Sequence, residues 1–287
     1  MPSPPSSPRA PRIGICGAGV GGLTLAGILP RTLPRARIAV FERAPADRDQ
    51  GYGLDLDKHG QEALARAGVY HRYWEISRPF SDSMAFFPMH GEGLLGVYFR
   101  PAMLRYLFPS FMAAQPETNR GALRNVLLDA MASNENVSVQ FEADVRDIRA
   151  NGAGADLLDG AGGHLGTFDL VVDAMGLHST LRQHRVHDAT DGKKPTGTTI
   201  IHGMINDPEK CCGPALLGQL SRFGTVCSAG HIFMQRYGAG AKDNRTSLMY
   251  YLHDVSEERL YAEMGIQRPK SRATGIMKDE RLDRVKE

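Results

Sequence analysis

The feature that most constrains this chain is a run of glycines between an apolar segment and a segment with helical spacing. Gly17, Gly19 and Gly22 satisfy the pattern G-x-G-x-x-G, after residues 12–16 and at the start of residues 20–29. In such a turn the first glycine makes the tight bend, the second lets the backbone approach a pyrophosphate, and the third allows close helix–strand packing. The pattern therefore predicts a strand, a turn and a helix whose N-terminus receives phosphate groups.

The flanking segments extend this motif to a βαβ unit. Residues 12–16 (RIGIC) and 37–41 (RIAVF) have the composition of short buried strands, and Pro30 is expected to end the helix that begins at Val20. A strand, a helix and a second strand in so short a span imply a parallel sheet with a right-handed crossover.

Composition narrows the class of protein. The chain has 34 Lys and Arg against 32 Asp and Glu, so its net charge of +2 suggests no basic face for nucleic acid. Residues 13–29 carry no charge, but glycines interrupt them throughout, which argues against a signal peptide or a membrane span. Four cysteines without a C-x-x-C pair indicate neither a disulfide scaffold nor a metal motif. We therefore expect a soluble, cytoplasmic protein that binds a small molecule.

The chain divides by composition and periodicity. Asn119 is available as N-cap of the clearest helix, and period-2 segments beyond Thr196 predict an antiparallel sheet. We expect four parts: a disordered leader at 1–11, a dinucleotide-binding domain at 12–190 with a β-rich insertion at about 137–168, a partial second domain at 191–255, and a charged, loosely packed tail at 256–287.

An acidic residue follows the second strand of the unit. Glu42 lies about 20 residues after Gly22, where an acid accepts hydrogen bonds from an adenosine ribose. An acid rather than an arginine favours an unphosphorylated ribose, as in FAD or NAD, over NADP. The alternative is a packing turn in which Glu42 is a solvated strand end.

Longer segments of the chain resemble the group-A flavoprotein monooxygenases, which are aromatic-hydroxylase-like FAD enzymes. These segments are FERAP, GYGLDLDKHGQEALARAGV, PETNRGALRNVLLDAM and FDLVVDAMGLHSTLR. The tetracycline-inactivating branch is most similar, because its members carry a like G-x-L-D-L…GQEA…AG segment. The resemblance runs from Arg12 to about residue 205. It implies an α/β fold: a Rossmann-like FAD-binding domain with a β-rich insertion and a partial antiparallel-sheet substrate domain.

The resemblance also implies roles for individual residues. The implied FAD contacts are Gly17, Gly19 and Gly22 at the pyrophosphate, Glu42 at the ribose, Arg43 at the adenine end, Asp55 near the flavin ring, Arg120 on its helix, and Gly176 in the later motif. His202 occupies a strand position where related enzymes place a polar substrate-contacting residue. Plainer alternatives stay open: Arg120 as a first-turn arginine, Asp55 as a turn acid, and His202 as an ordinary strand histidine.

Two departures from the family pattern bear on function. The family has an acid within its motif D-L-V-V-x-A-D-G-x-x-S-x-x-R, associated with cofactor and NAD(P)H contacts. This chain keeps Gly176, Ser179 and Arg182 but has Met175 in place of the acid. The family's third motif, Gly-Asp-Ala-Ala-His, has no counterpart. We therefore expect a C-terminally truncated chain.

The resemblance implies an oxidoreductase that uses NAD(P)H as a transient reductant and O2 to hydroxylate an aromatic or polyketide-like small molecule. Met175 and the missing motif leave open a non-catalytic FAD- or nucleotide-binding protein or fragment. An NAD-dependent dehydrogenase is disfavoured by the breadth of the resemblance. No residue is assigned as catalytic. The nearby His178, His184 and His187 lack a completing acid or cysteine, so we expect no metal site.

Overall fold

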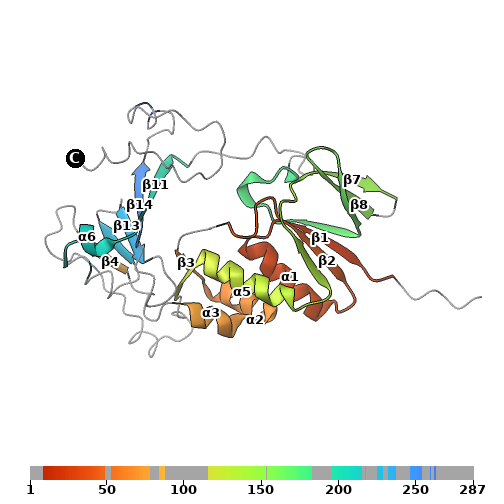
Figure 1. Cartoon of the computed structure of the whole chain (residues 1–287), viewed down its shortest axis with the longest axis horizontal. Helices are drawn as coiled ribbons and strands as arrows, with labels where there is room; N and C mark the ends of the chain where they lie inside the picture. Colours follow the sequence, from red (N-terminus) through yellow and green to blue (C-terminus); the bar gives the residue numbers. More distant parts are fainter. Residues whose placement is uncertain are drawn as a thin grey trace, which may run out of the picture.

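A four-stranded parallel sheet lies at the centre of one half of the molecule, which we call the parallel-sheet half (Figure 1). Its strands run in the order β10–β1–β2–β6, which are Leu170–Asp173, Arg12–Cys16, Arg37–Phe41 and Val137–Gln140. The computed structural model describes residues 9–48, 53–77, 84–87, 116–152, 154–182, 196–214, 217, 225–228, 232–236, 246–253, 259 and 262. Most of the expected leader and tail therefore lies outside the described residues.

Four helices lie on one side of this sheet, two packed against its strands and two packed against those helices (Figure 1). They are α1 (Val20–Thr32), α2 (Lys58–Ala67), α3 (Tyr70–Ile76) and α5 (Arg120–Ala132). The layer between helices and sheet is a continuous apolar cluster, whose most deeply buried members include Ile15, Leu23, Val40, Leu123 and Leu127. Burial of these side chains is the main force that holds the βαβ unit together.

A three-stranded antiparallel sheet covers the opposite face. Its strands are β7 (Val145–Asn151), β8 (Gly154–Asp159) and β9 (His164–Phe168). The rings of Phe41 and Phe168 meet edge to face, with their centroids 5.7 Å apart. A Cβ at Gly14 would lie 3.0 Å from the Phe168 ring, so the glycine in β1 gives this ring its place against the parallel sheet.

A second, five-stranded sheet lies at the other end of the molecule (Figure 1). Its order is β11–β14–β13–β12–β4, which are Thr198–Ile205, Thr246–His253, Ile232–Arg236, Thr225–Ser228 and Met84–Phe87. All pairs are antiparallel except β12 with β4. Short α6 (Pro208–Cys211) follows β11. The antiparallel sheet expected beyond Thr196 is therefore present, and β4 adds a strand from much earlier in the chain.

A short ladder of two strands connects the parallel-sheet half to this second sheet. β3 (Gly53–Asp55) pairs with β5 (Glu117–Asn119), and β5 leads directly into α5. A Cβ at Gly53 would lie 3.0 Å from the side-chain oxygen of Gln235 in β13. The β3–β5 ladder and β13 are therefore in close contact.

Helix ends follow local chemistry, with one correction. Asn119 caps α5 as expected, because its side-chain oxygen accepts a hydrogen bond from the Ala122 N–H at 2.9 Å. The expectation that Pro30 ends the first helix is wrong, since α1 continues to Thr32. Proline removes one N–H donor, and the Thr32 hydroxyl and the Leu33 N–H both bond to the Leu29 carbonyl and hold the last turn.

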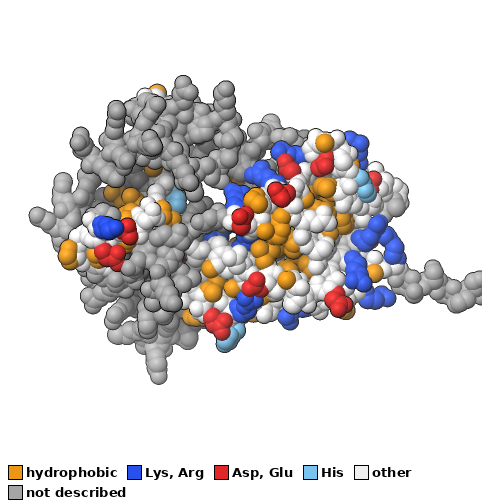
Figure 2. Space-filling model, in the orientation of Figure 1, with side chains coloured by type: hydrophobic (Ala, Val, Ile, Leu, Met, Phe, Trp, Pro, Cys, Tyr) orange, Lys and Arg blue, Asp and Glu red, His pale blue; other side chains and the backbone are white. Residues whose placement is uncertain are grey.

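The observed layers confirm the mixed α/β fold class with a Rossmann-like unit. No helix within the described ranges is long and apolar enough to cross a membrane. On the face shown in Figure 2, positive and negative side chains of the described residues are interspersed. This mixture agrees with the near balance of charges in the sequence.

Candidate functional site

The glycine turn forms the centre of the candidate site. Gly17 has a φ of +112°, and a Cβ there would lie 2.5 Å from the Ala174 carbonyl oxygen. A Cβ at Gly22 would collide with the Gly17 carbonyl oxygen. At Gly19, in contrast, no atom of the described residues lies within 4 Å of the Cβ position. The first and third glycines are thus required by the protein's own packing, and the second leaves a space that a ligand can approach.

The N-terminus of α1 opens beside this space. Its N-cap is Gly19, which offers no side-chain acceptor, and its first turn contains no acidic residue. The N-terminal N–H groups and the helix dipole therefore favour an anion from outside the helix. These features match the requirements of a pyrophosphate group.

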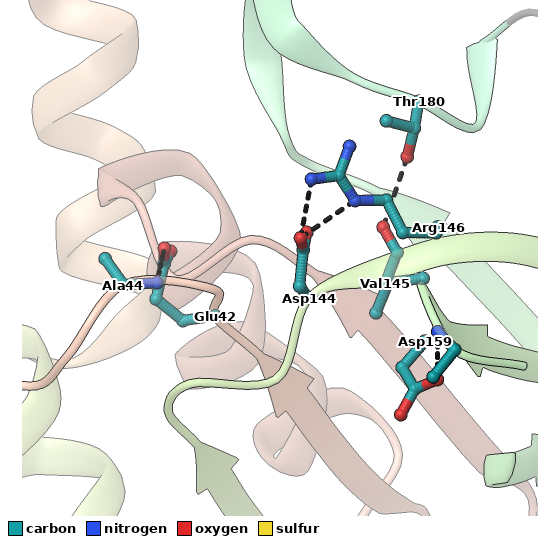
Figure 3. Close-up of polar contacts among 8 residues, drawn as sticks. Glu42, Ala44, Asp144, Val145, Arg146, Asp159 and Thr180 are labelled. Carbon is teal, nitrogen blue, oxygen red and sulfur yellow. Dashed lines mark hydrogen bonds and ion pairs between the residues drawn. The ribbon is translucent and has the colours of Figure 1, made fainter. Parts of the chain in front are cut away.

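Glu42 lies next to the glycine turn, and Figure 3 shows it beside Ala44. Its Oε2 accepts a hydrogen bond from the Ala18 N–H at 3.0 Å, and its Oε1 accepts one from the Ala44 N–H at 2.9 Å. Each carboxylate oxygen can accept a further hydrogen bond. The acid identified from its spacing is thus held beside the glycine turn, with acceptor capacity left for ribose hydroxyls.

The other proposed cofactor contacts come from neighbouring segments. Arg43 follows Glu42 directly and is exposed. Asp55 is the exposed end of β3 and lies opposite Glu117 in the short ladder, while Arg120 is the first residue of α5 after that ladder. The ladder therefore joins the two segments with Gly53 next to the start of α5 and Asp55 at the opposite end of the ladder. The roles of all three residues stay predictions.

The loop after β10 lies next to the glycine turn, because β10 and β1 are paired and Ala174 touches Gly17. Gly176 has a φ of +67°, a conformation that favours glycine, and its carbonyl oxygen accepts a hydrogen bond from Arg182 Nη2 at 2.7 Å. Asp173 accepts hydrogen bonds from the Met175 N–H and the Ser179 hydroxyl. Asp173, which the sequence reasoning did not single out, therefore shapes this loop.

The β7–β9 sheet is tied to the same loop (Figure 3). The Thr180 hydroxyl donates to the Val145 carbonyl oxygen at 3.1 Å. Beside it, Arg146 pairs with Asp144 at 2.7 Å in the segment that leads into β7. Met175 is partly buried and packs against the apolar side chains between the two sheets. The loop is thus anchored on both sides, and Met175 contributes to packing.

Cys16 ends β1 immediately before the turn and is fully buried. Burial, with a smaller contribution from the negative charge of Asp173, raises the pKa of its thiol to about 12. A thiol with this pKa stays protonated and unreactive near neutral pH. Cys16 is therefore a packing residue of the site.

His202 lies in β11 of the second sheet. Its Nε2 is 2.8 Å from the Ser247 hydroxyl, and partial burial lowers the pKa of the imidazole. In the ladder Ser247 lies opposite Gln235, so these three side chains share one face of the sheet. Gln235 reaches the Gly53 position of the β3–β5 ladder, which means that this face is turned toward the parallel-sheet half.

An aromatic pair occupies the same face of the second sheet. The rings of Phe233 and Tyr251 have centroids 4.7 Å apart, and Phe233 lies opposite Met249, the neighbour of His202 across β11 and β14. Alternation along the strands places all of these residues on the face that carries His202. The face combines an imidazole, a hydroxyl and an aromatic surface.

Curated proteins with related sequences are monooxygenases. The chain is similar to 3-amino-4-hydroxybenzoate 2-monooxygenase PtmB3 of Streptomyces platensis, with 25% identity over 213 residues, which are 69% of this chain and 47% of that protein. It is 30% identical over 179 residues to FAD-dependent monooxygenase aptC of Emericella nidulans, which is 58% of this chain and 42% of aptC. The chain thus spans about half the length of the curated relatives it matches. No protein-family model matches it.

Solved structures show the same fold. CtdE in complex with FAD superposes with a TM-score of 0.62 at 17% identity, over 86% of this chain and 61% of CtdE. Tetracycline destructase Tet(51) superposes with a TM-score of 0.56 at 17% identity, over 90% of this chain and 64% of Tet(51). The expected resemblance to FAD-dependent monooxygenases is therefore confirmed, and their fold is the fold of this chain.

Proposed function

We propose that this chain is the FAD-binding part of an NAD(P)H- and O2-dependent monooxygenase that hydroxylates an aromatic or polyketide-like small molecule in the cytoplasm. The observation that carries the proposal is the geometry of the glycine turn. Backbone atoms fill the Cβ positions of Gly17 and Gly22, whereas the Cβ position of Gly19 faces open space among the described residues. The relatives and the shared fold support FAD as the dinucleotide rather than NAD.

The residues present fit the proposed cofactor. Gly17, Gly19 and Gly22 would hold the pyrophosphate at the N-terminus of α1, and Glu42 would accept hydrogen bonds from the ribose. We further propose contacts from Arg43, Asp55, Arg120 and Gly176, in the segments that border the turn. The division into an FAD-binding domain at 12–190 and a substrate domain at 191–255 is part of the same proposal.

When bound, the flavin accepts electrons from NAD(P)H and delivers them to O2, and this chemistry belongs to the cofactor. The chain's own contribution is to bind, to orient and to exclude water. On the second sheet, His202 with its Ser247 partner offers a polar contact to a substrate. The neighbouring rings of Phe233 and Tyr251 offer an aromatic surface, which suits a planar substrate.

The absorbance spectrum of the purified chain tests the cofactor directly. We expect the two visible bands of oxidised flavin, either as purified or after reconstitution with FAD. A matched pair of variants, Glu42→Gln in the site and Glu62→Gln on the exposed face of α2, should differ in flavin retention, with Glu62→Gln like the parent. A colourless protein that cannot be reconstituted would overturn the proposal.

Anaerobic addition of NADH or NADPH then separates an enzyme from a binding protein. Loss of the visible flavin absorbance on addition of either nucleotide supports a monooxygenase. A flavin that is bound but is reduced by neither nucleotide supports the second candidate, a non-catalytic FAD-binding protein. The observation that favours this candidate is Met175, which stands where the family has its acid and packs, partly buried, against an apolar cluster.

A further inference from the structure

Arg124 is a buried cation, and it is not among the residues that were given a role above. It lies on α5, one turn after Arg120, and is only 1% exposed. Its Nε donates to the Ala18 carbonyl oxygen at 3.2 Å, and its Nη1 donates to the Ala46 carbonyl oxygen at 2.9 Å. The guanidinium carbon also lies 5.4 Å from the ring centroid of Phe141. One side chain thus joins the glycine turn, the segment after Glu42 and the segment after β6.

Glu42 and Arg124 both bind the glycine turn and the 44–46 segment, Glu42 through backbone N–H groups and Arg124 through backbone carbonyl oxygens. Glu42 accepts hydrogen bonds from the N–H groups of Ala18 and Ala44, and Arg124 donates to the carbonyl oxygens of Ala18 and Ala46. Ala18 is the residue between the first two glycines of the turn, so both of its backbone polar groups are fixed. The hydrogen bonds of both side chains therefore fix the separation between the glycine turn and the 44–46 segment.

The guanidinium is not fully satisfied by the fold. Its Nη2 atom is buried and has no hydrogen-bond partner among the described residues. A buried cation with an unmade hydrogen bond costs stability, and apolar replacements of buried charges are often neutral or stabilising. Stability alone is therefore a weak reason for an arginine at this position, and its two loop contacts indicate a different reason.

We propose that Arg124 is a positioning residue for the adenosine half of the cofactor. It holds the Ala18 and Ala46 carbonyls so that the glycine turn and the 44–46 segment keep Glu42 directed at the ribose. This inference rests on the proposed dinucleotide site. It does not require that the protein be a monooxygenase, because the adenosine half is present in any adenine dinucleotide and in ADP.

Binding of ADP, FAD and FMN to the purified chain tests the proposal. We expect Arg124→Met to weaken ADP and FAD about tenfold or more, with Arg124→Lys between Arg124→Met and the parent, because lysine keeps the charge without the fork. FMN, which lacks the adenosine half, should bind the parent and Arg124→Met equally. The matched control is Arg72→Met, which removes a half-exposed arginine that also contacts α5, at Val126 and Asp129. This control should bind ADP like the parent.

Hydrogen exchange on the ligand-free chain provides a readout that does not depend on cofactor. We expect Arg124→Met to increase amide exchange in 17–19 and 44–46 while β7–β9 is unchanged. If Arg124→Met does not fold, Arg124→Lys carries the test, and it must show both weaker ADP binding and faster exchange in those segments. A folded Arg124→Met that binds ADP as the parent does overturns the inference and leaves the proposed function standing. A parent chain that binds neither ADP nor FAD overturns both.

Discussion

The carbonyl oxygen of Gly17 occupies the space that a Cβ on Gly22 would need. This contact packs the start of α1 directly against the end of β1. Gly17 begins the three-residue turn at 17–19 and Gly22 lies in the helix that follows, so the contact is made entirely within the sequence motif.

The first prediction concerns Gly22. Gly22→Ala should lower the free energy of unfolding by about 2 kcal/mol or more, because the added methyl meets rigid backbone. Gly21→Ala is the control: its Cβ position is open, and alanine in a helix is favoured over glycine by roughly 0.5 kcal/mol or more. Urea unfolding of both variants checks this. Equal stabilities for the two variants would show that the close contact is not present in solution.

A substitution at Gly19 is expected to affect ligand binding but not folding. Gly19→Ala should leave the free energy of unfolding within about 0.5 kcal/mol of the parent, since no described atom lies near the new methyl group. Affinity for FAD should fall by about tenfold, because the methyl group occupies the space where a pyrophosphate approaches the backbone. Isothermal titration with FAD measures this loss. Undiminished affinity would place the phosphates elsewhere.

Glu42 is expected to affect both properties. Glu42→Gln replaces one acceptor oxygen with an amide donor, so either the Ala18 or the Ala44 N–H loses its partner. We expect a loss of about 1 kcal/mol in stability and a larger loss in FAD affinity, on the order of tenfold or more, because charged acceptors make stronger hydrogen bonds. Fluorescence titration against the Glu62→Gln control measures the second effect. FAD affinity equal to the control would argue that Glu42 is only a structural residue.

Met175 tests the departure from the family pattern. Met175→Asp should increase the rate at which NAD(P)H reduces bound flavin, at a stability cost of about 1 kcal/mol from lost packing. Met175→Leu keeps the apolar contacts and should leave the rate unchanged. Anaerobic stopped-flow absorbance measures the rate. An unchanged rate in Met175→Asp would show that this position has no contact with the reductant.

His202 predicts a pH dependence of stability. Partial burial lowers the pKa of His202 in the folded chain below the ordinary value of 6.5. Between these two pKa values the unfolded chain therefore binds more protons than the folded chain. The His202 contribution to stability should therefore rise with pH up to about 6.5 and stay constant above it. Unfolding of the parent and of His202→Gln across this range measures the difference. Parallel curves for the two proteins would contradict the shift.

Much of the candidate site around the glycine turn could be predicted from local sequence. The spacing of Gly17, Gly19 and Gly22 and the acid Glu42 reflect requirements of a single βαβ unit, in which neighbours in sequence are neighbours in space. Asn119 was recognisable as a helix cap for the same reason. The helix end at Pro30 was mispredicted, because side-chain and backbone bonds to Leu29 continue the helix through the proline.

The sequence by itself determined the βαβ unit and its glycine turn, since these depend on short-range backbone chemistry, and its longer segments showed the resemblance to FAD-dependent monooxygenases. Only the tertiary structure decided what surrounds the turn. Arg124 reaches Ala18 and Ala46 across 106 and 78 residues of chain, and Gln235 meets Gly53 from the second sheet. Such contacts form when the layers pack, so their only trace in the sequence is an arginine on the apolar face of a helix.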